Sequence, residues 1–188
     1  VLIGLSFLGI PIYLSLGIGT VLAMTMSGMP LVVIPQKMFV GIDSVALLAI
    51  PFFMIAGNVM ARGITLKLID VSNSLIGWVK GSLGMVTVLA SALFGSITGS
   101  AVATVSAIGG TTIPAMKREG YSTEFASALA SGASVLGPLI PPSITLIVYG
   151  AIVETSIADL FLASVIPGTL FAASLLLYTY FYAKKHNY

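Results

Sequence analysis

The sequence predicts an all-α membrane protein, a polytopic bundle of helices. Three observations support this fold class. Of the 188 residues, 57% are hydrophobic and 7% are charged, whereas about a quarter of the residues in a soluble domain are charged. The mean hydropathy is +1.10. Several uncharged runs reach the roughly 20 residues that a helix needs to cross a bilayer, so the lipid bilayer is the expected surroundings.

Composition also excludes several classes of function. The chain has no cysteine, which excludes disulfides and thiolate metal sites. The net charge of +2 comes from scattered residues and forms no basic patch for nucleic acid. We expect no cofactor, and no metal other than Na⁺. The chain begins with Val1 and shows no cleavable signal, which suggests a fragment or a trimmed chain.

Residues 1–80 are predicted to hold two scaffold-like spans and a helix at the membrane surface. The first span covers residues 1–26, with a Gly-Ile-Pro break at residues 9–11. A loop with two prolines follows. The second span runs from about residue 38 to residue 61, with Pro51 inside it.

The next segment, residues 62–80, has a different pattern. Apolar and polar side chains form separate stripes at helical spacing, and Trp78 fits the depth of the lipid headgroups. This pattern favours an interfacial arm helix, and the alternative is an ordinary cytoplasmic linker helix. The apolar stripe holds Ile64, Leu68, Val71 and Leu75, and the polar stripe holds Lys67, Asp70 and Ser74.

Residues 81–116 are 36 consecutive residues without a charge. One straight helix of that length would measure about 54 Å, well beyond a hydrocarbon core of about 30 Å. Two half-length helices fit better, with a turn in the Gly/Ser/Thr cluster at residues 95–100. The segment is therefore predicted to form a re-entrant helical hairpin.

The distribution of positive charge supports the hairpin. If residues 81–116 enter and leave on one side, Lys37 lies alone and the other seven lysines and arginines share the opposite side. If the segment crosses, the division becomes five and three. Positive residues concentrate on the cytoplasmic side, so both ends of the hairpin are predicted to be cytoplasmic.

Residues 121–156 are predicted to form a span that is broken near the bilayer midplane. A Ser-Thr-Glu triplet at residues 122–124 offers a helix start. The sequence GPLIPPS, residues 137–143, then places three prolines within five positions, and proline removes a backbone donor and clashes with the preceding turn. The last span, within residues 157–188, ends in three tyrosines and a basic cytoplasmic tail.

The hairpin tip and the proline break point to ion and solute binding. Each unsatisfied backbone group costs several kcal/mol in hydrocarbon, so irregular backbone persists where it is buried or faces a wet cavity. Carbonyls and hydroxyls without acidic side chains suit a weakly bound Na⁺. The N-termini of half-helices suit a carboxylate. Together these features are typical of secondary transporters with discontinuous helices.

Both features have plainer alternatives. Gly95 and Gly99 form a G-x-x-x-G pair, which by itself marks close helix packing, and prolines kink many membrane helices. Alanine at Ser96, Ser100 or Ser143 would separate the two interpretations, because packing tolerates alanine and a sodium site does not.

The sequence is also compatible with functions other than transport. Oligomerised copies could form a channel or a passive pore. The chain could also be a structural membrane subunit that uses its small residues for packing. An intramembrane protease needs paired aspartates, or a serine with a histidine or lysine partner, and the uncharged interior offers neither, so the protein is not expected to be an enzyme.

The residues that carry these features resemble a known family. GSITGSAVATVSAIGGTTIPAMKREGY, GPLIPPSITLIVYG and SIADLFLASVIPG are similar to the large membrane subunit of the tripartite ATP-independent periplasmic (TRAP) transporters. The resemblance covers essentially the whole chain, which matches the first of two inverted repeats. It implies a transport-type region at residues 81–156, made of hairpin 81–116 and broken helix 121–156.

The resemblance also implies a mechanism and partners. Such a subunit works by an elevator movement with a small membrane subunit and a periplasmic solute-binding protein. It imports organic acids, of the dicarboxylate or sialic acid class, with Na⁺ across the inner membrane of a bacterium or archaeon. The large subunit of the family is about twice as long, so the second hairpin would lie outside this chain.

Site residues are carried over by matching positions at the two breaks. The resemblance places a sodium site at Ser96, Thr98, Gly99, Ser100, Gly137 and Pro138. It places one wall of the substrate site at Ser100, Ala101, Pro141, Pro142 and Ser143.

Overall fold

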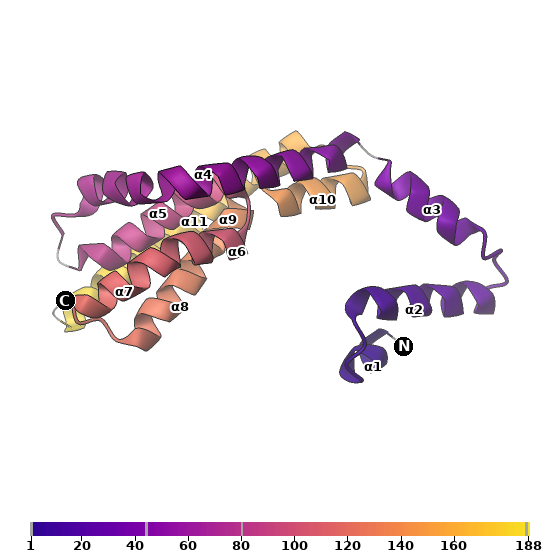
Figure 1. The fold of residues 1–188 in the computed structure, drawn as a ribbon, viewed down its shortest axis with the longest axis horizontal. Helices are drawn as coiled ribbons and strands as arrows, with labels where there is room; N and C mark the ends of the chain where they lie inside the picture. The colour runs from indigo at the N-terminus through magenta and orange to yellow at the C-terminus, as the bar shows by residue number, and fades with distance from the viewer. Residues whose placement is uncertain (1, 44, 80, 187) are drawn as a thin grey trace. The chain divides into compact units, whose positions relative to one another are not determined.

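The structure, a computed structural model, describes residues 2–43, 45–79, 81–186 and 188 (Figure 1). Over these residues the secondary structure is helical and contains no strand, which agrees with the predicted all-α class. The chain separates into two compact units, Val1–Ser44 and Val45–Tyr188.

The first unit holds three helices. They are α1 (Leu2–Phe7), α2 (Ile12–Met26) and α3 (Val33–Ile42). The predicted break at residues 9–11 is confirmed, because Gly9 has a φ of +78° and Pro11 is the N-cap of α2. α3 begins at Val33, before the predicted start at residue 38. Pro35 does not prevent this, because it lies in the first turn of the helix, where a proline is tolerated.

The second unit begins with α4 (Val45–Ile76), a continuous helix of 32 residues. The sequence predicted one span over about residues 38–61 and a separate helix after it. Both boundaries were wrong, because α3 ends at Ile42 and α4 continues through residue 61. Gly57 and Gly63 lie on either side of the expected boundary, and a glycine costs about 1 kcal/mol without ending a helix. The interfacial placement of residues 62–80 stays a prediction.

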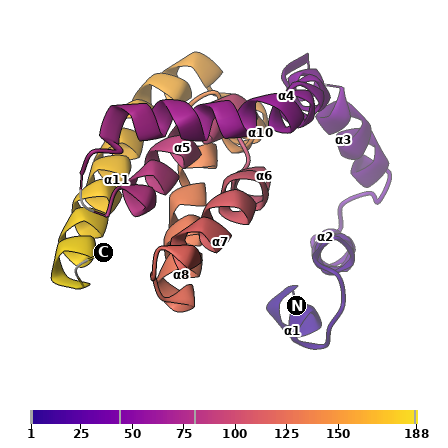
Figure 2. The same ribbon diagram turned by 60° about the vertical axis from the view of Figure 1, so that its left-hand side comes forward.

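A helical hairpin follows α4. Its first arm is α5 (Ser82–Thr98), and its second arm is formed by α6 (Ala101–Thr104), the π-helical η1 (Val105–Gly109) and α7 (Gly110–Arg118). The chain reverses at residues 99–100, inside the predicted cluster, and the second arm returns alongside the first (Figure 2).

The broken helix comes next. It comprises α8 (Thr123–Ser134), α9 (Leu136–Leu139) and α10 (Ile144–Val153). The axis bends by 44° between Thr123–Leu139 and Ile144–Val153, so the predicted break is confirmed. It lies off centre, since only the ten-residue α10 follows it. Gly137 and Pro138 belong to the last turn before the break.

The final helix, α11 (Ile157–His186), matches the predicted last span. Within the described residues it is the one helix long and apolar enough to cross a membrane unaided, and there are up to three such spans if each bent helix pair counts as one. The packed core lies between α5, α8 and α11 and includes Val88, Phe125 and Leu129.

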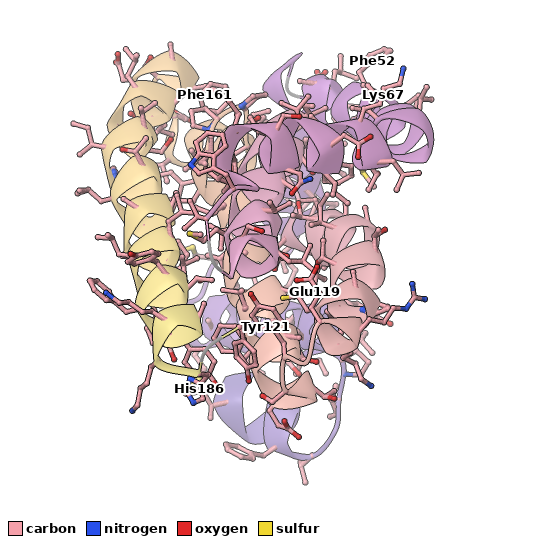
Figure 3. All side chains as sticks on the ribbon, turned by 90° about the vertical axis from the view of Figure 1, so that its left-hand side faces the viewer. Phe52, Lys67, Glu119, Tyr121, Phe161 and His186 are labelled. Atoms are coloured by element: carbon pink, nitrogen blue, oxygen red, sulfur yellow. The ribbon has the colours of Figure 1, made fainter. Side chains whose placement is uncertain are left out.

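An aromatic cluster joins several helix ends at one end of the second unit. Phe125 stacks on Tyr182 with ring centroids 3.8 Å apart, and Tyr121 stacks on Tyr188 at 4.2 Å. Figure 3 shows Tyr121 and His186 at this end. Burial raises the pKa of the Tyr121 hydroxyl. A methyl group on Gly81 would lie 3.3 Å from the Tyr121 hydroxyl oxygen. Gly81 precedes the first arm of the hairpin and Tyr121 follows the second arm, so the two arms begin and end at the same end of the unit.

Candidate ion and solute site at the two helix breaks

The hairpin and the broken helix meet through their glycines. A methyl group on Gly95 would lie 2.6 Å from the Cα atom of Gly137. A methyl group on Gly137 would lie 3.0 Å from the carbonyl oxygen of Ser100. A methyl group on Gly95 would force the backbone to shift, and one on Gly137 would be tight, so the two backbones pack closely, as small residues allow in membrane helices.

The hairpin tip rests on the beginning of α10. Gly99 ends α5 with a φ of +61°, a left-handed conformation that favours glycine. A methyl group there would also lie 2.9 Å from the Pro142 carbonyl oxygen and 2.9 Å from the Ile144 nitrogen. Gly99 is therefore required both by the turn and by the contact.

Two serines start the helices that follow the breaks. Ser100 caps α6 and accepts a hydrogen bond from the Ala103 N–H at 3.3 Å, and Ser143 caps α10 and accepts one from the Leu146 N–H at 3.3 Å. Their backbones are nearly the same, with φ and ψ of −132° and 122° at Ser100 and −126° and 125° at Ser143. Two helix N-termini, each with a positive dipole end, therefore begin at the breaks.

Most hydroxyls here are already engaged in the structure. The Ser143 hydroxyl donates to the Pro138 carbonyl at 2.6 Å, and the Ser96 hydroxyl donates to the Leu93 carbonyl at 2.8 Å. Ser100 serves as a cap. Alanine at these serines would therefore also remove structural hydrogen bonds. The expectation that such variants separate packing from sodium binding stays a prediction, and its test requires a stability control.

The Ser143 hydroxyl is expected to be structurally important. Ser143→Ala removes a cap and leaves the Pro138 carbonyl without its donor, which should lower the free energy of unfolding by about 1–3 kcal/mol. The thermal unfolding midpoint without Na⁺ measures this loss. Ser156→Ala is the matched control, because Ser156 caps α11 at an exposed position. Equal midpoints for the two variants would contradict a buried structural role.

Thr98 is the exception among these hydroxyls. Its side-chain oxygen is buried and has no hydrogen-bond partner within the described part of the chain, and the residue is only 3% exposed. It borders a cavity of about 240 Å³ lined by Met54, Gly57, Thr98, Ser100, Ala103 and Ile144. Because α5 ends at Thr98, the carbonyls of its last turn lack helical donors, apart from Gly95, which accepts from the Gly99 N–H at 2.7 Å.

The structure brings most of the sequence-predicted residues together. Contacts or hydrogen bonds between the two breaks, or within the second break, involve Gly99, Ser100, Gly137, Pro138, Pro142 and Ser143. Ala101 begins α6 and Pro141 lies inside the break, each next to a residue in this set. Ser96 directs its hydroxyl back into its own helix.

Four of the six lining residues were missed from the sequence, and two of these, Ala103 and Ile144, lie inside the predicted transport-type region. Met54 and Gly57 come from α4, outside the predicted transport-type region. A glycine inside a helix usually has a packing reason, and that was the available signal. No group of three or more His, Cys, Asp or Glu residues that could hold a metal occurs in the described part of the chain.

Comparison with known proteins gives the family. The family model for the tripartite ATP-independent periplasmic transporter, DctM component, matches residues 1–188. The chain is 38% identical over 190 residues to the sialic acid TRAP transporter large permease protein SiaM of Vibrio cholerae, covering 99% of this chain and 44% of the relative. It is 37% identical to the C4-dicarboxylate TRAP transporter large permease protein DctM of Rhodobacter capsulatus, covering 100% and 46%.

A third relative carries another solute in its name. The isethionate TRAP transporter permease protein DctMQ of Oleidesulfovibrio alaskensis is 37% identical, over 96% of this chain and 29% of the relative. The chain therefore spans less than half the length of these relatives. These relatives are transport proteins rather than enzymes, which confirms the prediction that the protein is not an enzyme. The chain belongs to the DctM family, the large permease components of TRAP transporters.

Proposed function

We propose that this chain is the first half of the membrane component of a sodium-coupled importer of organic acids. The observation that carries the proposal is the buried Thr98 hydroxyl, which has no hydrogen-bond partner among the residues that the structure describes; Thr98 borders a cavity at the meeting point of the two breaks. A buried hydroxyl without a partner costs about 1–3 kcal/mol. A bound cation would remove that cost.

The surroundings of Thr98 suit a monovalent cation. The oxygens available are neutral, namely the hydroxyl and the carbonyls that end α5, and the C-terminus of a helix carries about half a negative charge. Neutral oxygens without a carboxylate bind a cation weakly enough for release in each transport cycle. Sodium, a hard ion with a preference for oxygen, is the proposed ligand.

The solute is proposed to be an anion. α6 and α10 both begin at the breaks, and their positive ends favour a carboxylate or a similar group. The three relatives are named for sialic acid, C4-dicarboxylates and isethionate, all of which are anionic at neutral pH. An organic acid of the dicarboxylate or sialic acid class is therefore proposed here.

The glycine contacts support an elevator movement. Because Gly95, Gly99 and Gly137 interlock backbone with backbone, hairpin and broken helix would move as one rigid block. The rest of the subunit, a small membrane subunit and a periplasmic solute-binding protein are the proposed partners. The inner membrane is the proposed location.

Sodium dependence tests the proposal. In proteoliposomes that contain the complete subunit and its partners, replacing external Na⁺ with K⁺ is expected to abolish solute accumulation, because the ion supplies the driving force. A sodium ionophore should do the same, and a proton ionophore should leave the initial rate unchanged. Accumulation at the full rate without Na⁺ would overturn the proposal, and non-saturable uptake without the binding protein would indicate a pore.

A further inference from the structure

α4 reaches the hairpin tip through a glycine. Gly57 is buried, and a methyl group there would lie 3.4 Å from both the Cα atom and the methyl carbon of Thr98. By contrast, Gly63 on the same helix is exposed, and a methyl group there would meet nothing within 4 Å. Of the two glycines of α4, Gly57 contacts the hairpin tip and Gly63 does not.

The same part of α4 lines the cavity at Thr98. Met54 and Gly57 lie three residues apart and so share one face of the helix. The Met54 side chain is 54% exposed, which places it at the mouth of the cavity, whereas Gly57 is buried beside Thr98. A side chain larger than hydrogen at position 57 would extend into this space.

We propose that α4 is the third wall of the site, and that Gly57 is a positioning residue that leaves room for a small cation beside Thr98. Its lack of a side chain lets the helix approach the tip closely while the cavity stays unfilled. The physiological meaning of this wall rests on the proposed sodium site. Its geometry can be tested without transport.

Accessibility of position 98 to a cationic thiol reagent tests the wall. The 188 residues contain no cysteine, so Thr98→Cys introduces the only thiol of this region, and any cysteine elsewhere in the complete subunit is replaced with serine first. The labelling rate with a methanethiosulfonate ethylammonium reagent is measured in membranes. The second changes are Gly57→Ala and Gly57→Leu, with Gly63→Ala and Gly63→Leu as matched controls on the same helix.

The expected order of rates follows from the contact distances. Alanine at position 57 fits at 3.4 Å, so Gly57→Ala should slow labelling about twofold to threefold. Gly57→Leu should fill the cavity and slow labelling at least tenfold, whereas both Gly63 variants keep the parental rate. Equal labelling rates for the Gly57 and Gly63 variants would contradict the proposal that α4 forms a wall of the site. A Thr98→Cys parent that does not react with the reagent would contradict it as well. If Gly57→Leu does not fold, the alanine pair still decides.

Sodium protection separates this inference from the proposed function. With Na⁺ in place of K⁺, the proposed site predicts slower labelling of Thr98→Cys, because the ion occupies the space. If Na⁺ has no effect while Gly57→Leu still blocks the reagent, the wall stands and the sodium site fails. If Na⁺ protects while the Gly57 variants behave like the Gly63 variants, the wall fails and the sodium site stands.

Discussion

Replacing Gly95 with alanine is expected to cause a large loss of stability through a clash between the hairpin and the broken helix. The new methyl group would lie 2.6 Å from the Cα atom and 2.8 Å from the nitrogen of Gly137. Both are backbone atoms, so no flexible side chain can move aside. Overpacking costs about 1–3 kcal/mol where side chains adjust, and more where the backbone must shift. The thermal unfolding midpoint of the complete subunit in detergent measures the effect.

Gly132→Ala provides the control for Gly95→Ala. Gly132 lies within α8, and a methyl group there would meet nothing within 4 Å. Both substitutions gain helix propensity worth about 1 kcal/mol, so the difference between them isolates the contact with Gly137. A Gly95→Ala midpoint at or above that of Gly132→Ala would show that hairpin and broken helix do not pack as described.

The breaks were predictable from the sequence because their signals are local. A left-handed glycine and a run of prolines act on their own turn, so the reversal at Gly99 and the break before Ser143 appear at the predicted places. The boundary near residue 61 failed because a change in polarity from apolar to amphipathic does not end a helix. Nothing in α4 at that point removes a backbone donor, and the helix continues.

The site was only partly predictable, because its assembly depends on contacts between distant segments. The cost of unsatisfied backbone marked both breaks as candidates for a site, and the structure shows that they touch. Which hydroxyls remain available could not be read from composition. Ser96 and Ser143 form hydrogen bonds within or beside their own helices, whereas Thr98 has no partner among the described residues. Gly57 lies some forty residues before the tip in sequence, and only the fold brings the two together.

Replacing Thr98 with valine is expected to have opposite effects on stability without and with sodium. Valine keeps the shape of threonine and removes the hydroxyl. Without Na⁺ this deletes an unpaired buried polar group, so the free energy of unfolding should stay the same or rise by about 1 kcal/mol. With Na⁺, loss of a ligand should raise the sodium Kd at least tenfold. That lowers the sodium-dependent gain in stability by about 1.4 kcal/mol at a fixed high concentration.

Two further variants identify the hydroxyl as the cause. Thr98→Ser keeps the hydroxyl and should retain the sodium Kd within about threefold. Thr112→Val removes a buried hydroxyl that already donates to the Ile108 carbonyl at 3.0 Å, so it should lower stability equally with and without Na⁺. The measurement is the unfolding midpoint across a sodium titration with choline as the balancing ion. If Thr98→Val keeps the full sodium response, the Thr98 hydroxyl is not a ligand, and the cation must be bound elsewhere.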